Sequence, residues 1–229
     1  IGIRPTEGIF GKKILNNFLK RLKKNGSKFS YRKVKNKSKK VYEANITVFD
    51  ALKKSDYDPQ GKFFLERYVS AHSIMISFEG IPAVYLNSLF GKSNDEAKYI
   101  ITGNNRDVNR YKWNYKNISK KLDNKNSKQS IFYQKISNLL NIKRNQKAFH
   151  PNAPRQNINL GSKIFSFKRT SINKEQTIIC ITNLSSLIQK APLNKVYHNW
   201  NNLIGSKIEI KNKFLILKPY ETIWLSNKR

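Results

Sequence analysis

The chain has 229 residues, of which 38% are hydrophobic and 12% aromatic, enough apolar material for one large or two small folded domains. This composition excludes a disordered basic segment. The sequence contains neither an apolar run of about 18 residues nor a signal-peptide pattern, so we expect no membrane span and no secretory leader. The single cysteine, Cys180, excludes an internal disulfide and lies in an apolar run, which predicts a buried thiol in a cytoplasmic protein.

The formal net charge of +31 allows two interpretations. A basic surface can bind nucleic acid or another polyanion. Alternatively, lysine has risen together with asparagine and isoleucine, as in proteins from AT-rich genomes. We favour the second interpretation, because the excess is mostly Lys and the densest run, Lys33–Lys40, has no interleaved aromatic residues for base stacking. Nucleic-acid binding is therefore kept only as a third functional alternative, and the charge suits attraction of an anionic substrate such as phosphate.

Three stretches carry apolar residues at helical spacing. The first, Lys12–Lys24, ends at Asn25-Gly26, which is a typical C-terminal stop. The second, Phe63–Phe78, follows Asp58-Pro59, a helix-start signal, and the third is Ser127–Lys143.

The segments between these helices carry weaker signals. Residues 26–41 are polar and basic and predict a loop, and residues 41–54 look ordered without a clear type. Ile81–Leu86 is a short apolar run rich in β-formers, which predicts a buried parallel strand, and a long polar segment follows it. A helix, a strand and a long loop in this order are expected of the last unit of a (β/α)8 barrel, where the residues after each strand build the active site.

After about residue 156, short apolar or alternating runs are separated by Asn, Gly, Ser and Pro. This pattern predicts a small antiparallel β domain with Trp200 and Trp224 in its core. The predicted strands are 163–169, 177–183, 207–210, 214–218 and 222–225.

Several motifs occur along the chain in the order found in one enzyme family. They are Tyr42–Leu52, Glu79–Tyr85, Ser88–Asp95 and Thr102–Arg110, followed by Phe149–Pro151 and Leu217–Leu225. Together they resemble the sucrose phosphorylase-like branch of glycoside hydrolase family 13, and within it the glucosylglycerate phosphorylases. The resemblance covers nearly the whole chain and implies an α/β fold, in which residues 1–155 are the C-terminal part of a (β/α)8 TIM barrel and residues 156–229 a small antiparallel β-sandwich domain.

The resemblance implies a retaining glycoside phosphorylase that transfers glucose from an α-glucoside to inorganic phosphate, giving α-glucose 1-phosphate. In such chemistry an Asp is the nucleophile and a Glu the acid/base, and the family adds an Asp, paired with a His, that stabilises the transition state. In the family, that His-Asp pair lies just ahead of a Gly-Ile-Gly segment. Ile1-Gly2 of this chain resembles the end of that segment. We therefore expect no catalytic carboxylate in this chain, no activity of the chain alone, and the N-terminal half of the barrel as a partner. Phosphate is the co-substrate, and no cofactor or metal is expected.

Five residues match binding positions of the family. Arg106 matches an Arg that pairs with an Asp and holds the glucose, a task that suits a guanidinium fork. Tyr42 and Glu43 match a mobile acceptor-site loop that reads Tyr-Gln in sucrose phosphorylases. The Glu disfavours sucrose as the preferred substrate and is compatible with a glycerate-type or other acceptor. Asn94 and Asp95 lie on the loop after the eighth strand, near the sugar pocket of the family.

Each of these assignments has a structural alternative. Arg106 can be an ordinary surface residue of a basic protein, although its flanking motif favours the site. Tyr42 and Glu43 can equally be packed loop residues, and Asn94 and Asp95 suit loop capping better than substrate binding.

The remaining polar residues and the chain itself also have alternative interpretations. Asp107 and Arg110 can equally form a structural ion pair or touch substrate, and His72 is expected to be packed in its apolar helix. His150 and His198 have no companions at metal-ligand spacing, so no metal site is expected. The second functional alternative is a split-gene remnant that acts as a partner subunit.

Overall fold

The computed structural model describes residues 1–34, 38–192, 197, 199–205 and 208–228, and they form two compact units. The first unit contains residues 1–61 and 84–133, and the second contains residues 62–83 and 134–229. Each unit is therefore built from two separate stretches of chain. The boundary expected near residue 155 concerns the family's domain division and stays a prediction.

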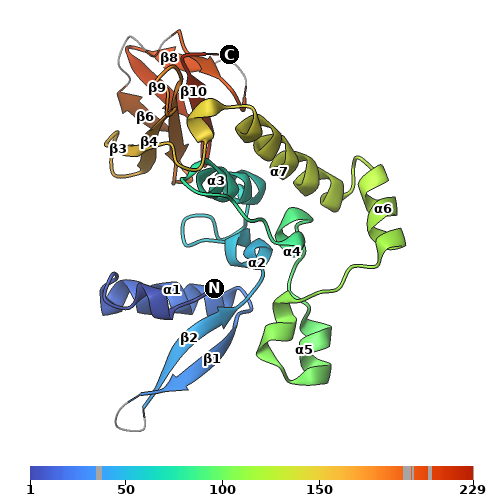
Figure 1. The fold of residues 1–229 in the computed structure, drawn as a ribbon. Coiled ribbons are helices and arrows are strands. Elements are labelled where there is room, and N and C mark those ends of the chain that lie inside the picture. Colours follow the sequence, from blue (N-terminus) through green and yellow to red (C-terminus); the bar gives the residue numbers. More distant parts are fainter. Residues whose placement is uncertain (35–37, 193–196, 198, 206–207, 229) are drawn as a thin grey trace. The chain divides into compact units, whose positions relative to one another are not determined.

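The first unit combines short helices with one β-hairpin (Figure 1). Its elements are η1 Arg4–Thr6, α1 Lys12–Lys24, β1 Lys28–Lys33, β2 Lys39–Asn45, α2 Val48–Lys53, α4 Leu86–Leu89, α5 Glu96–Thr102, η3 Asn105–Asn109, α6 Tyr115–Asp123 and the first residues of α7 Lys128–Arg144.

The helix predicted for Lys12–Lys24 is confirmed as α1, with the predicted end. Asn25 is its C-cap, and Gly26 follows with a φ of 92°, a conformation that glycine adopts without steric cost. Leu22 packs with Ile3 and Ala44 in the core of this unit. Local capping and the burial of one apolar face therefore both support this helix.

The loop predicted for residues 26–41 is wrong, because the structure forms the hairpin of β1 and β2 there. Phe29 pairs with Ala44, and Tyr31 with Val41. The side-chain amide of Asn45 donates to the backbone oxygen of Lys28 over 3.1 Å and so ties the open end of the hairpin. The short alternation of polar and apolar residues in these strands is difficult to recognise among the many lysines. Part of the dense lysine run, residues 35–37, lies outside the described residues.

Gly91 follows α4 with a φ of 57°, and an added Cβ would lie 2.7 Å from Cγ of Phe132. We expect Gly91→Ala to lower the free energy of unfolding by about 2–5 kcal/mol, since left-handed strain and overpacking add up. Gly103→Ala is the matched control, because its φ of 63° is similar but its Cβ would meet nothing within 4 Å. Urea denaturation of both variants measures the difference, and equal losses would contradict the predicted clash.

The second unit places helices beside two antiparallel sheets. Its elements are α3 Phe64–Ser77, the later residues of α7, η4 Lys147–Phe149, β3 Arg155–Ile158, β4 Ile164–Thr170, β5 Thr177–Asn183, β6 Gln189–Pro192, β7 Asn201–Asn202, β8 Glu209–Lys211, β9 Phe214–Leu217 and β10 Thr222–Ser226. One sheet has the strand order β3-β4-β5-β10-β7 and the other β6-β9-β8. The antiparallel β region predicted after residue 156 is confirmed, although β3, β6 and β7 were missed. The predicted strand 207–210 begins at Lys207, outside the described residues.

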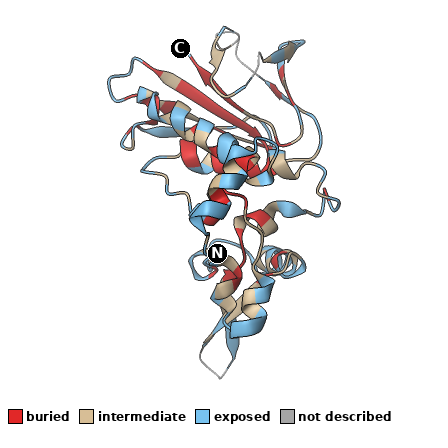
Figure 2. Cartoon of the chain, turned by 90° about the vertical axis from the view of Figure 1, so that its right-hand side faces the viewer, coloured by how far each residue is buried: buried red, intermediate tan, exposed pale blue. Residues whose placement is uncertain are grey.

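Strand β5 is buried on both faces, and Figure 2 shows buried residues running along the long strands of this unit. Ile179 and Ile181 belong to the apolar cluster that also contains Leu215 of β9. Successive side chains of a strand alternate between faces, so Cys180 points to the opposite side. Trp224 is fully buried, as predicted, and its ring centroid lies 4.8 Å from that of Phe149.

Burial raises the pKa of the Cys180 thiol from its ordinary 9.0 to about 12. The raised pKa means that the neutral thiol is favoured in the folded state, so its stability contribution is complete below pH 9 and declines as the pH rises towards 12. We expect a thiol reagent at pH 8 to leave the native chain unlabelled and to label the chain fully in about 6 M guanidinium, where global unfolding exposes the thiol. Rapid labelling of the native chain would contradict the packing of β5.

The parallel strand predicted for Ile81–Leu86 is wrong for this structure, because residues 81–85 form no strand and α4 begins at Leu86. The side chain of Ile81 is 86% exposed. A buried parallel strand needs hydrogen-bonding neighbours on its edges, and none of the described residues pairs with this segment. The closed parallel barrel is therefore not seen among the described residues.

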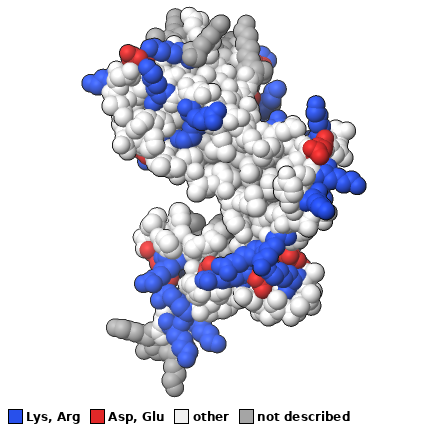
Figure 3. All heavy atoms as spheres, turned by 45° about the vertical axis from the view of Figure 1, so that its right-hand side comes forward, with Lys and Arg blue, Asp and Glu red and all other residues white. Residues whose placement is uncertain are grey.

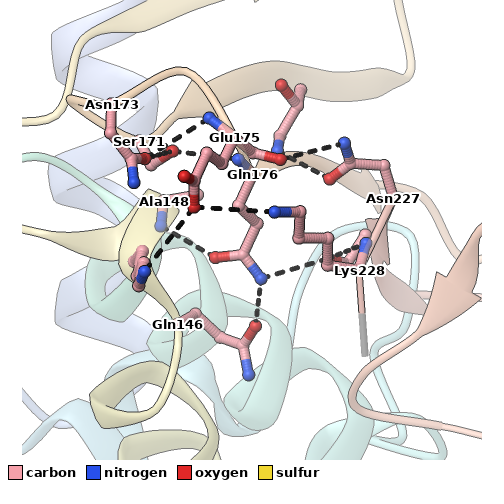
Figure 4. Close-up of polar contacts among 11 residues, drawn as sticks. Gln146, Ala148, Ser171, Asn173, Glu175, Gln176, Asn227 and Lys228 are labelled. Atoms are coloured by element: carbon pink, nitrogen blue, oxygen red, sulfur yellow. Dashed lines mark hydrogen bonds and ion pairs between the residues drawn. The ribbon is translucent and has the colours of Figure 1, made fainter.

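A buried polar cluster joins three segments of the second unit (Figure 4). The side-chain oxygen of Gln176 accepts from the backbone of Ala148 over 2.9 Å, and its amide donates to the side-chain oxygen of Gln146 over 2.6 Å. Glu175 lies 3.6 Å from the ammonium groups of both Lys147 and Lys228. Because Gln176 is buried, these bonds fix η4 to the start of β5.

No helix within the described ranges has the length and apolarity to cross a membrane.

Candidate functional site

Arg106 and Glu43 form an ion pair on the first unit, with 3.0 Å between Nε and Oε2. Arg106 lies in η3, whose N-cap residue Asn104 accepts a hydrogen bond from the Arg106 backbone over 3.1 Å. Glu43 lies in β2. The hydrogen bond and charge of Glu43, and secondarily the neighbouring Tyr42, raise the pKa of Arg106 above its ordinary value. The structure thus brings three of the five predicted site residues together.

The segment around Arg106 is fixed to the hairpin and to α5. The side-chain amide of Asn105 donates to the backbone oxygen of Phe29 over 2.9 Å. Asp107 forms an ion pair of 3.3 Å with Lys98, whereas a pair with Arg110 is one of the two alternatives that the sequence leaves open. A hydrogen bond from Thr102 and the charge of Lys98 lower the pKa of Asp107. These bonds therefore hold in place the turn that carries the Arg106 guanidinium.

Residues 1–3 run antiparallel to β2 beside this cluster. Ile1 and Ala44 exchange hydrogen bonds, with the backbone nitrogen of Ala44 donating to the oxygen of Ile1 over 2.8 Å. The backbone nitrogen of Ile3 donates to the oxygen of Tyr42 over 2.8 Å, and Gly2 stands opposite Glu43. The first three residues therefore extend the hairpin at the position of the site.

Asn94 makes hydrogen bonds to three segments of the same unit. Its side-chain oxygen accepts from the backbone nitrogen of Thr47 over 2.9 Å, and its amide donates to the oxygen of Gly26 over 3.2 Å. Its backbone nitrogen donates to Asp50 over 2.5 Å. Both ends of the Asn94 side chain are thus used to hold the N-terminus of α2 and the turn after α1.

Asp95 caps α5, since its carboxylate accepts from the backbone nitrogen of Lys98 over 3.2 Å. Its own backbone nitrogen donates to the oxygen of Val108 in η3 over 2.7 Å. The capping geometry expected as the structural alternative is present for this residue. Asn94 and Asp95 form a second group, and Asp95 braces the turn that carries Arg106.

Sequence reasoning missed Asp50, although a signal for it was present. Thr47 and Asp50 have the spacing of a capping box, in which a residue at the helix start and one three positions later exchange hydrogen bonds. In the structure the Thr47 hydroxyl accepts a hydrogen bond from the Asp50 backbone nitrogen over 3.2 Å, and the Asp50 carboxylate accepts one from the backbone nitrogen of Asn94.

Among the described residues, no group of three or more His, Cys, Asp or Glu side chains is arranged to hold a metal ion. His72 is buried, with Nδ1 2.9 Å from the backbone oxygen of Tyr68, and burial lowers its pKa. The prediction of a packed histidine is confirmed. His150 is exposed, and His198 lies outside the described residues.

Positive charge gathers in the lower part of Figure 3, the part that holds the hairpin and α5, with acidic side chains among the basic ones. Ion pairs of 3.0 Å between Lys28 and Glu96 and of 2.7 Å between Arg32 and Glu7 lie in this unit. The surface of this unit is therefore basic overall, and acidic side chains neutralise some of its positive charges in ion pairs.

Comparison with known proteins finds similar glycoside phosphorylases, although no match to a family model. The chain is 26% identical over 229 residues to glucosylglycerate phosphorylase of Escherichia coli, covering 98% of this chain and 39% of that protein. It is 25% identical to glucosylglycerate phosphorylase of Spirochaeta thermophila, covering 100% of this chain and 41% of that protein. It thus spans about two fifths of the length of these relatives.

A solved structure shares part of the fold. The crystal structure of sucrose 6F-phosphate phosphorylase from Thermoanaerobacter thermosaccharolyticum superposes with a TM-score of 0.65 at 19% identity, over 80% of this chain and 35% of that one. The sequence matches extend over nearly the whole chain, as does the resemblance read from the ordered motifs. The predicted resemblance to the glucosylglycerate phosphorylases, of the sucrose phosphorylase-like branch of glycoside hydrolase family 13, is confirmed by these sequence matches.

Proposed function

We propose that the chain is the C-terminal part of a retaining α-glucoside phosphorylase that transfers glucose from a glucosylglycerate-type substrate or sucrose to phosphate. Residues 1–155 would supply the last units of a (β/α)8 barrel and residues 156–229 its C-terminal β domain. The relatives are more than twice as long as the matched region, so the catalytic carboxylates are assigned to the part that precedes this region in the family. This assignment accounts for their absence from the site.

The observation that supports the proposal best is the contact between Arg106 and Glu43. Two residues that match separate family motifs, 63 positions apart, meet at 3.0 Å, with Tyr42 beside them. The Arg106 side chain is 46% exposed, so its guanidinium is accessible from solvent. Tyr42 and Glu43 are the residues that the resemblance assigns to the acceptor loop, so their position beside Arg106 fits one shared binding site.

The chemistry of the cluster fits a sugar subsite. A guanidinium presents several donors in a rigid plane and can hold vicinal hydroxyls or a carboxylate. In the proposed enzyme Arg106 pairs with an Asp and holds the glucosyl ring. The pairing of residues 1–3 with β2 supports a shared site, because Gly2 lies opposite Glu43 and so beside the Arg106–Glu43 pair.

The direct test is reconstitution. The preceding three fifths of the Escherichia coli relative are joined to Ile1, and phosphate-dependent formation of α-glucose 1-phosphate is measured with glucosylglycerate and with sucrose. We expect a folded fusion to be active, with glucosylglycerate preferred because Glu43 replaces the Gln of sucrose phosphorylases, and the chain alone to be inactive. Activity of the chain alone, or a folded fusion inactive with both substrates, would overturn the proposal.

A non-catalytic partner subunit is the second candidate, favoured by apolar side chains on α5. Ile100 and Ile101 are 77% and 83% exposed. Adjacent exposed isoleucines favour association with a complementary chain. Light scattering after gel filtration tests this candidate, and a monodisperse monomer at high concentration would count against it.

A further inference from the structure

A cavity of ≈230 Å³ lies in the second unit and is lined by residues of α3, of α7 and of the turn that leads into β10. It is separate from the Arg106 cluster, which belongs to the first unit. Sites for drug-sized ligands measure about 300–1,000 Å³, so this cavity suits a smaller molecule, about the size of one sugar ring. Nothing in the proposed phosphorylase reaction uses it.

The polar part of the lining is rich in hydrogen-bond acceptors. Glu66 of α3 and Glu221 of the turn are among the lining residues. One carboxylate oxygen of Glu221 accepts from the Lys218 backbone over 2.8 Å, which leaves its other oxygen for a ligand. Ser70 and Ser73 donate their hydroxyl protons to carbonyls of their own helix over 3.0 and 2.8 Å, which leaves oxygen lone pairs for the cavity. Such a lining matches a ligand that carries several hydroxyl donors.

The charges around the cavity exclude strongly charged ligands. The chain has only 14 acidic residues, and two of them line this cavity, which disfavours an anion. Lys135 of α7 lies in the same lining and disfavours a cation, and Asn138 adds a neutral amide. A neutral donor-rich molecule fits this balance best.

The other side of the cavity is apolar and includes Tyr220. Tyr220 is the third residue of a turn in which the Glu221 backbone donates to the oxygen of Lys218 over 3.1 Å, and its φ is 53°. Glycine is the usual residue at such a position. The tyrosine ring instead packs with Arg67 at 5.0 Å and with Phe63 at 6.2 Å, and it contributes to the cavity wall.

We propose that this cavity binds a neutral polyhydroxylated molecule of single-sugar size. Glu66 and Glu221 accept hydrogen bonds from its hydroxyl groups, and Tyr220 covers its apolar face. Carboxylates opposite an aromatic or aliphatic wall match a sugar ring, which has hydroxyl groups at its edge and C–H groups on its faces. The proposal concerns the second unit alone and does not depend on the proposed phosphorylase activity.

The test is a titration of the 229-residue chain with D-glucose, followed by amide NMR spectra. We expect saturable shifts confined to α3, α7 and residues 218–222. Glu66→Gln should weaken binding about tenfold or more, because a hydrogen bond to a charged acceptor is lost. Glu209→Gln is the control, since it removes the same charge from β8, away from the cavity.

A second variant, Val69→Phe, fills the cavity from α3 and should abolish the shifts while distant amides stay unchanged. Absence of saturable shifts in the unaltered chain would overturn the proposal. Equal affinity of Glu66→Gln and the control, or tighter binding of methylammonium than of glucose, would overturn it as well. None of these readouts involves phosphorolysis, so failure here is distinguishable from failure of the proposed function.

Discussion

Arg169→Met is expected to lower the free energy of unfolding of the second unit by about 3–5 kcal/mol, the range measured when a buried charge network is broken. Arg169 is 0% exposed, and its guanidinium donates to the backbone oxygens of Ser77, His150 and Ala153 over 2.7, 2.8 and 3.0 Å. Burial lowers its pKa, and the charge of Glu79 opposes that shift. Methionine fills similar space but leaves three buried carbonyl groups without these donors.

Urea denaturation followed by tryptophan fluorescence, to which buried Trp224 contributes, measures this loss. Lys168→Met is the matched control, because it removes one positive charge from the neighbouring, half-buried position of β4. Arg169→Lys should recover little, since an ammonium group cannot reproduce the geometry of the planar guanidinium. If Arg169→Met and the control lost equal stability, the three-carbonyl clamp would not be what holds α3 to this unit.

In an active fusion, Arg106→Lys is expected to lower kcat/KM about 10²–10³-fold, because correct orientation of the reacting ring depends on the rigid fork. The replacement keeps the charge and can still meet Glu43. Stability should change little, since an exposed ion pair contributes weakly to folding. Comparison of kcat/KM for phosphorolysis with urea midpoints separates the two effects.

Arg110→Lys is the control for this prediction, since it makes the same change within the same motif, outside the Arg106–Glu43 contact. We expect its kcat/KM to stay within about tenfold of the parent, because its geometry is not tied to the cluster. An Arg106→Lys fusion as active as the Arg110→Lys fusion would show that Arg106 has no role in binding the glucosyl ring.

Local physics made the long helices predictable. Lys12–Lys24, Phe63–Phe78 and Ser127–Lys143 each carry an apolar face, and the structure has helices there with ends shifted by at most one residue. The same holds for the β strands around Cys180 and Trp224, whose side chains are buried.

The two wrong predictions have a common cause, which is dependence on neighbours. The hairpin of β1 and β2 is stabilised by cross-strand pairs such as Phe29 with Ala44, which no local pattern announced among so many lysines. Ile81–Leu86 looks like a buried strand, but a parallel strand exists only beside partners. Such partners are not found among the described residues.

The candidate site divides in the same way. Motif resemblance selected Arg106, Glu43 and Tyr42, yet the contact between Arg106 and Glu43 joins positions 63 apart and could not be read from either motif. The role of Asn94 as a link between Gly26 and Thr47 was likewise invisible, because hydrogen bonds between distant segments leave no periodicity in a sequence.

The sequence by itself determined the resemblance to the glucosylglycerate phosphorylases, the helices with strong apolar faces, the antiparallel character of the region after residue 156 and the residues worth testing. Tertiary structure alone decided which of those residues meet, that Arg169 would be buried against three carbonyls, and that a cavity would open beside Tyr220. The physical reason is the distance along the chain over which each kind of interaction acts. Capping and periodic burial act within a few residues, whereas ion pairs, clamps and cavities depend on where separate segments come to lie.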